Sequence, residues 1–268
     1  MKEFRVSSEI ELFDIIDHKR KEWVLFRGQE NSKWTVDSKI VRSSIEEFYN
    51  IDYIQLDPSI RTSVLFHKNM IQVMQHKRNT YHISEKLHIL AQENQGIDPE
   101  FEVLKLLQQY PDSESTHQKI IGTNLIDWSY DPWIALYFAT NNTKNFENND
   151  AVLYIYNSQN TPNVLQSKKL ENVYSLMNDL DYQNCTKGML PIIFHPQKLI
   201  SDQRAHNQKA IYVAQMDFRY DLVDVWKRYE EETGQHIITK ILIPENVRHV
   251  CRNHLLKLGY NQSYIYPN

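Results

Sequence analysis

The sequence predicts an α+β fold, in which a mixed or antiparallel sheet is flanked by helices. Short segments rich in aromatic and branched residues, typical of strands, recur at residues 22–26, 151–156 and 237–243. Helical patterns lie between these segments. The 268 residues could form one large domain or two small ones, and no domain boundary is evident in the sequence. A single domain over residues 1–268 is the simpler expectation.

The composition argues against several kinds of site. With 6 glycines in the whole chain, a glycine-rich nucleotide cradle of the Rossmann or P-loop kind is not expected. A net charge of −4 gives no global basic field, so nucleic acid is not an indicated partner. Cys185 and Cys251 fall in no ligand pattern, and the histidines between residues 67 and 88 form no pair at helical spacing. We therefore expect no metal.

The sequence also predicts no contact with a membrane. Its amino terminus lacks the apolar core of a signal peptide, and no window approaches the roughly 18 apolar residues that a spanning helix needs. We expect a cytoplasmic protein without a membrane partner.

The first predicted element is an amphipathic helix over residues 7–16. Ser7 and Ser8 provide hydroxyl caps, and Ile10 and Phe13, joined by Leu12 and Ile16, would form one apolar stripe that packs on the sheet. A strand over residues 22–26 follows.

Arg27 lies at the predicted exit of that strand. Gly28 would allow a sharp turn or the close backbone approach of a ligand, and Gln29 adds an amide beside the guanidinium. A phosphate or carboxylate ligand would fit this corner. The alternative is that Arg27 pairs with an internal carboxylate and fixes the loop.

Residues 31–42 predict a second short strand and then the start of a helix, with Asp37 or Ser38 as the N-cap. Together with the preceding strand, this segment resembles the FRG domain family, which is named for a Phe-Arg-Gly tripeptide followed by a Trp and a Ser-x-x-x-Arg. The residues in those places are Phe26, Arg27, Gly28, Gln29, Trp34, Ser38 and Arg42.

A largely helical region is predicted from residue 40 to about residue 109, divided by Pro58 and by a turn at residues 95–99. Residues 122–139 then predict a short strand, a turn and a helix with Pro132 in its first turn. They resemble the second FRG signature, Thr-x-Leu-Leu-Asp-Trp-Thr followed by an Ala-Leu-x-Phe-Ala helix. The matching residues are Thr123, Asp127, Trp128, Ser129 and residues 135–139. His117 stands one residue earlier than the histidine of the family.

Strands are predicted at residues 151–156 and 190–196, with a helix near residues 169–180 between them. Residues 202–214 resemble the family's Arg-x-x-x-Gln-x-Gly-x-Phe segment, with Arg204 and Gln208 aligned. A strand and a helix within residues 237–267 resemble the family's ending. The resemblance thus covers the segments 22–42, 122–139, 202–214 and 237–267, and implies one FRG domain.

The layout of these segments resembles that of ADP-ribosyltransferases, which implies NAD as a substrate and an ADP-ribosyltransferase-like fold. Arg27 would hold the pyrophosphate, Thr123 and Ser129 would orient the ribose or neighbouring side chains, and Trp34 or Trp128 would stack on a ring. In those enzymes a Glu on a later strand aids transfer. Gln208 carries no charge, so Asp127 or another acid would take that role. The remaining residues of the expected ligand site are Gly28, Gln29, Arg42 and Arg204.

Two hypotheses follow from the resemblance. The first is an enzyme that transfers ADP-ribose or cleaves NAD, with catalytic residues Arg27, Asp127 and Gln208 and an acceptor that the sequence does not name. The second is a non-catalytic module that recognises a nucleotide, a nucleic-acid end or a protein in the same cleft. A buried ion pair between Arg27 and Asp127 without a cleft would favour the second. An open cleft with a free carboxylate near Arg27 would favour the first. The resemblance also implies a role in bacterial or phage conflict.

Overall fold

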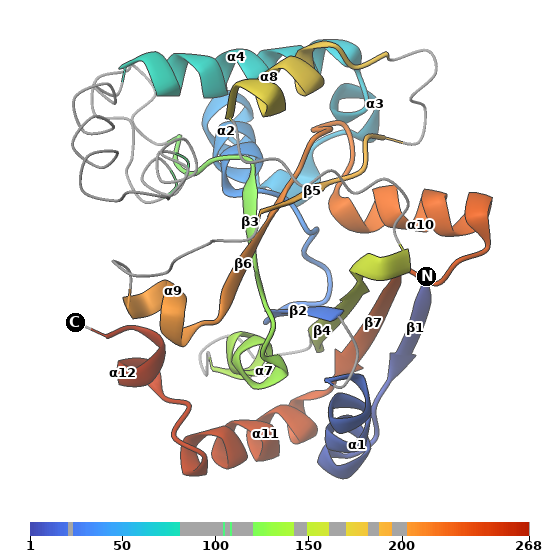
Figure 1. Ribbon diagram of the computed structural model, residues 1–268, viewed down its shortest axis with the longest axis vertical. Helices are drawn as coiled ribbons and strands as arrows, with labels where there is room; N and C mark the ends of the chain where they lie inside the picture. Colours follow the sequence, from blue (N-terminus) through green and yellow to red (C-terminus); the bar gives the residue numbers. More distant parts are fainter. Residues whose placement is uncertain are drawn as a thin grey trace.

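Seven strands form one mixed sheet within the part of the chain that the computed structural model describes (Figure 1). This part comprises residues 1–20, 24–80, 104, 108, 120–141, 149–160, 170–181, 188–194 and 203–267. The strand order is β1-β7-β4-β2-β3-β6-β5, with β1 parallel to β7 and all other neighbours antiparallel. The strands are β1 Lys2–Arg5, β2 Val24–Gln29, β3 Leu125–Ser129, β4 Ala151–Asn157, β5 Ile192–Phe194, β6 Ala210–Ala214 and β7 Ile238–Ile243. The predicted α+β fold with a mixed sheet is confirmed.

Helices cover the sheet in separate groups (Figure 1). Helices α2, α3, α4 and α8 gather at the top of the view, and α1, α7 and α11 at the bottom. The helices are α1 Glu9–Lys19, α2 Lys39–Tyr49, α3 Pro58–Arg61, α4 Val64–Thr80, α7 Pro132–Thr140, α8 Leu170–Asn178, α9 Gln203–Asn207, α10 Leu222–Thr233, α11 Glu245–Lys257 and α12 Gln262–Ile265, with 3-10 turns at Tyr53–Gln55 and Ser158–Asn160. Among the described residues, no helix is long and apolar enough to cross a membrane.

The side chains of β2 alternate between two buried clusters, as a strand requires. Val24 and Phe26 pack with helices α1, α7 and α11, whereas Leu25 packs with Trp128 and Trp226 on the opposite face. Arg27 follows two residues after Leu25 and therefore projects to the same face as Leu25. Its neighbour on β4 is Tyr154. The predicted strand thus continues through Arg27 and Gly28 to Gln29, and Arg27 does not mark its exit.

Strands β2 and β3 have fewer paired residues than any other two neighbouring strands of the sheet. Strand β2 pairs with β4 along its whole length, but with β3 only where Phe26 faces Ser129. Continuing that register would place Gly28 opposite Asp127. Instead the two strands separate beyond Phe26, so the edge of β3 that faces β2 is not paired with β2 at Asp127.

Helix α7 lies directly against β2 at Gly28. A Cβ atom at this position would lie 1.8 Å from the carbonyl oxygen of Ala135 and 2.8 Å from the amide nitrogen of Ala139. Asp131 caps the helix by accepting a hydrogen bond from the Trp133 amide, and Pro132 occupies its first turn as predicted. Gly28 lies within β2, and a glycine is needed there because the backbone of α7 leaves no room for a side chain. The sharp turn expected at Gly28 is therefore wrong.

The predicted second strand within residues 31–42 is also wrong. Residues before α2 form a turn and an irregular segment, in which the Ser32 amide donates to the Asp150 carbonyl. Asp37 is fully buried, and Arg61 donates to both of its carboxylate oxygens. Ser38 is the N-cap residue of α2, but its side chain makes no capping bond, and its amide donates to Gln215 Oε1 at 2.9 Å. The contacts of Asp37 and Ser38 thus connect this segment to Arg61 and Gln215.

Other predicted elements agree with the structure in part. Helix α1 begins after Ser8, whose hydroxyl accepts from the Glu11 amide, but Ile10 is 66% exposed and does not belong to the buried stripe. The predicted strands and helices at residues 151–156, 169–180 and 237–258 are confirmed as β4, α8, β7 and α11. His117, Cys185 and the predicted turn at residues 95–99 lie outside the described residues.

Candidate functional site

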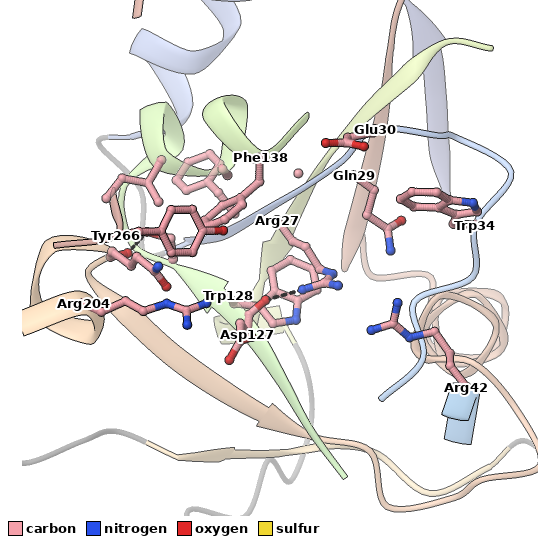
Figure 2. Close-up of a pocket in the computed structure, with 16 residues that line it drawn as sticks. Arg27, Gln29, Glu30, Trp34, Arg42, Asp127, Trp128, Phe138, Arg204 and Tyr266 are labelled. Carbon is pink, nitrogen blue, oxygen red and sulfur yellow. Dashed lines mark hydrogen bonds between the residues drawn. The ribbon is translucent and has the colours of Figure 1, made fainter. Parts of the chain in front are cut away.

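A cavity of about 370 Å³ opens where β2 and β3 separate (Figure 2). Because it lies at a gap in the hydrogen-bonded ladder, its lining comes from both faces of the sheet, with Arg27 from one and Gly28 from the other. The cavity brings together ten of the eleven predicted site residues: Arg27, Gly28, Gln29, Trp34, Arg42, Asp127, Trp128, Ser129, Arg204 and Gln208. Thr123 is the exception.

Arg27 bridges the two separating strands. Its Nη1 atom donates to the backbone carbonyl oxygen of Asp127 at 2.6 Å, and its Nε atom is buried with no hydrogen-bond partner in the described structure. Burial, followed by the field of Arg42, lowers the pKa of Arg27 to about 10. The alternative role for Arg27, an ion pair with an internal carboxylate, is not found among the described residues.

Three cations besides Arg27 act on Asp127. Arg42 and Lys39 come from the first turn of α2, and Arg204 comes from α9. Arg42 lies over the Tyr53 ring at 5.8 Å and, like Arg27, has a buried Nε atom without a partner in the described structure. Burial and then the charge of Arg42 lower the pKa of Lys39. This part of the site therefore concentrates positive charge in spite of the chain's negative net charge.

The Asp127 carboxylate lies in the electrostatic field of these cations. Its Oδ1 atom accepts a hydrogen bond from Gln108 Nε2 at 3.2 Å, and the side chain is exposed at the cavity wall. The walls displace water and so raise the pKa of Asp127, while Arg27, Arg204 and the other two cations act in the opposite direction. Asp127 neither caps α7, which Asp131 does, nor forms an ion pair within the described residues. A cleft whose carboxylate near Arg27 has no ion-pair partner among the described residues is the arrangement expected to favour the enzyme hypothesis.

Ser129 and Gln208 line the cavity, and their hydrogen bonds connect the chain segments around it. The Ser129 hydroxyl donates to the Gln208 carbonyl at 2.8 Å and accepts from the Asp131 amide at 2.9 Å. The Gln208 side chain donates to the Ile265 carbonyl at 3.2 Å, which ties the carboxy-terminal segment to the site. Gln208 lies in the turn before β6 and is not part of that strand.

Thr123 is 3% exposed and lies behind the cavity wall. Its hydroxyl donates to Gln108 Oε1 at 3.0 Å, and Gln108 in turn contacts Asp127. Thr123 is thus in a position to orient a neighbouring side chain, one of the two roles expected for it, and is not in a position to touch a ligand in the cavity.

Aromatic side chains form part of the cavity wall. Tyr266, which the Arg204 guanidinium overlies at 4.7 Å, packs edge-on against Phe138, while Trp34 is partly buried at the opposite side (Figure 2). Trp128 packs edge-on against Tyr156 and Trp226 and is 3% exposed, so its ring is chiefly a core residue.

Residues not predicted from the sequence also contribute to this site, among them Glu30, Phe138, Tyr266 and Gln108. Phe138 and Tyr266 fall within segments that resemble FRG signatures, so their positions could have suggested them. Gln108 belongs to a long helical pattern that gives no sign of a role. Among the described residues, no cluster of His, Cys, Asp and Glu could hold a metal ion.

Comparison with known proteins identifies the domain but gives no activity. The protein-family model described as FRG domain matches residues 22–148, which contain Arg27, Arg42, Thr123 and Asp127. No curated protein and no solved structure matches the chain. The chain therefore contains an FRG domain over residues 22–148, and these residues bring β2, β3 and α7 to a cation-rich cavity.

Proposed function

We propose that this FRG-domain protein binds NAD in the Arg27 cavity and breaks the bond between nicotinamide and ribose, passing ADP-ribose to an acceptor or to water. The observation that carries the proposal is the pair Arg27 and Arg42. Both guanidinium groups line one cavity, both have a buried Nε atom without a partner in the described structure, and Arg42 lowers the pKa of Arg27.

The charges around the cavity favour an anionic ligand. Arg27, Arg42, Arg204 and nearby Lys39 are balanced only in part by the acids Asp127 and Glu30. A pyrophosphate between Arg27 and Arg42 would reduce their mutual repulsion and supply acceptors for the unpartnered donors. The two negative charges of the NAD pyrophosphate correspond to the excess positive charge of these groups.

The shape and the walls of the cavity are compatible with a nucleotide. Its volume of about 370 Å³ lies near the lower end of the usual range of ligand sites, roughly 300–1,000 Å³. Trp34, Phe138 and Tyr266 offer ring surfaces against which a base or nicotinamide could pack.

Asp127 provides the charge that the reaction needs. When the bond between the ribose C1′ and the nicotinamide nitrogen breaks, the electron pair leaves with nicotinamide and positive charge develops on the ribose. A carboxylate in the cavity wall would stabilise that charge. A water or acceptor oxygen then bonds to C1′ and releases its proton to solvent, which gives ADP-ribose or an ADP-ribosylated acceptor.

One observation favours the second hypothesis, a module that binds without turnover. Gln208 stands where the resemblance implies a transfer-assisting residue, but its uncharged amide donates to the Ile265 carbonyl. The same cavity would then bind the nucleotide and present it to a partner. A role in phage conflict and a cytoplasmic location remain predictions.

The test is nicotinamide release from NAD by the wild-type chain, by Asp127→Asn and by the control Arg20→Gln, whose side chain pairs with Asp17 on the exposed surface of α1. We expect release by wild type and control, and a rate about 100-fold lower for Asp127→Asn with NAD binding retained. Binding of NAD without release by wild type would support the module. Neither binding nor release would contradict the proposed NAD site and would leave the second hypothesis, with a ligand other than NAD.

A further inference from the structure

A chain of hydrogen bonds leads from the main chain of β3 to the Asp127 carboxylate. The Leu125 amide donates to Thr123 Oγ1 at 3.2 Å, Thr123 Oγ1 donates to Gln108 Oε1 at 3.0 Å, and Gln108 Nε2 donates to Asp127 Oδ1 at 3.2 Å. Gln108 does not line the cavity. It approaches Asp127 from outside the group of residues that could touch a ligand.

The chemistry of these groups fixes the direction of the chain. An ionised carboxylate can only accept hydrogen bonds, so Gln108 must turn its amide nitrogen toward Asp127. Its amide oxygen then faces Thr123, whose hydroxyl must donate. Because the Leu125 amide already donates to that hydroxyl oxygen, the proton of the hydroxyl is directed at Gln108. Each group has one compatible orientation.

We propose that Gln108, oriented by Thr123, is a positioning residue that holds the Asp127 carboxylate ionised and aimed at the cavity. The catalytic part of this inference rests on the proposed NAD cleavage, whereas its effect on Asp127 does not. The Asp127 side chain is not held by an ion pair within the described residues, and this amide is the hydrogen-bond donor that the structure gives its carboxylate.

The charges facing Asp127 come from three other elements: Arg27 on β2, Arg42 and Lys39 on α2, and Arg204 on α9. All four favour the ionised carboxylate, while desolvation by the cavity walls opposes it and raises the pKa of Asp127. A hydrogen bond donated to the carboxylate adds to the effect of the cations. Its loss should therefore raise that pKa further.

The experiment compares wild type with Gln108→Met, which keeps the length of the side chain but removes the amide. The pKa of Asp127 is followed by the carboxyl ¹³C signal of labelled aspartate, assigned with Asp127→Asn, and Gln235→Met on an exposed segment is the control. We expect a higher Asp127 pKa and an about ten-fold lower kcat for nicotinamide release in Gln108→Met, with little change in KM. Thr123→Val should shift the pKa in the same direction, and Thr123→Ser should restore the wild-type value because it keeps the hydroxyl.

An unchanged Asp127 pKa in folded Gln108→Met would overturn the inference, as would a change in KM without a change in kcat. If wild type releases no nicotinamide, the proposed function fails, but the titration still decides whether Gln108 controls Asp127. Should Gln108→Met not fold, Gln108→Asn replaces it. The shorter amide cannot reach Thr123 and Asp127 together, so the same rise in the pKa is expected.

Discussion

Arg27 Nη1 donates to the carbonyl oxygen of Asp127 at 2.6 Å, across the point where β2 and β3 separate. The Arg27 side chain on β2 thereby replaces a backbone hydrogen bond of the sheet, and it binds a carbonyl oxygen of β3 where the two strands are no longer paired. The separation creates the cavity, and the same bond fixes the cation at its wall. Arg27 therefore joins the architecture of the sheet to the charge of the site.

Replacing Arg42 should weaken ligand binding without weakening the fold. Its Nε atom is buried without a partner in the described structure, and its charge opposes that of Arg27. Arg42→Met removes this repulsion and keeps most of the apolar side chain. We expect a free energy of unfolding equal to wild type or about 1 kcal/mol higher, and NAD affinity at least ten-fold lower. Urea unfolding and calorimetric titration measure the two quantities, and a loss of several kcal/mol of stability would contradict this role.

Replacing Arg61, in contrast to Arg42, should weaken the fold. Arg61 donates to both carboxylate oxygens of Asp37, whose side chain is fully buried. Arg61→Met would leave that carboxylate without its cation, which should lower the free energy of unfolding by about 3–5 kcal/mol. Equal stabilities of Arg61→Met and Arg42→Met in urea unfolding would show that the two arginines are not distinguished as structural and ligand-binding.

Gly28→Ala should disrupt the contact between β2 and α7. The added Cβ would lie 1.8 Å from the Ala135 carbonyl oxygen, which is backbone and cannot move without the helix. We expect a loss of more than about 3 kcal/mol or failure to fold. The control is Gly234→Ala at the carboxy-terminal end of α10, where φ is +68° and no atom lies within 4 Å, so the cost should be about 1 kcal/mol. A Gly28→Ala protein as stable as Gly234→Ala would contradict the packing described.

Asp221 should make stability depend on pH. It caps α10 by accepting from the Asp224 amide at 2.9 Å, and burial, followed by the charges of Asp37 and Asp224, raises its pKa to about 7 in spite of Arg61. Since the folded state holds this proton more tightly than the unfolded chain, the stabilisation is complete below pH about 4 and is lost as pH rises to about 7.

The measurement for Asp221 is the free energy of unfolding of wild type and Asp221→Asn between pH 5 and pH 7.5. Asparagine keeps the cap but cannot titrate. Wild type should therefore lose stability relative to Asp221→Asn as pH rises. A difference that stays constant across this window would show that the carboxyl does not titrate there. The lowered pKa of Asp37 acts only in more acidic solution.

The strands and most helices were predictable because their signals are local. The composition around Phe26 predicts a strand, and Asp131 and Pro132 mark the start of α7 as caps do. The turn expected at Gly28 was wrong because the need for glycine comes from Ala135, more than 100 residues later in the chain. Local propensity carries no information about such a contact.

The site was predictable to the extent that family signatures mark it. Ten of the eleven residues chosen from the sequence line the cavity, including Arg27, Arg42 and Asp127. The eleventh, Thr123, lies behind its wall. Gln108 could not be found from sequence, because its role depends on a fold that brings it between Thr123 and Asp127. The pairing of Asp37 with Arg61 likewise depends on tertiary contacts.

The central claim is that the Arg27 cavity binds NAD, and thermal unfolding with and without millimolar NAD tests it most directly. A ligand that binds only the folded state adds about 2.7 kcal/mol at a hundred-fold excess over its dissociation constant. We predict a higher Tm with NAD for wild type and for the surface control Arg20→Gln, no such shift for Arg27→Ala, and a smaller shift for Arg42→Met. No shift in folded wild type, or an equal shift in all four proteins, would contradict the claim.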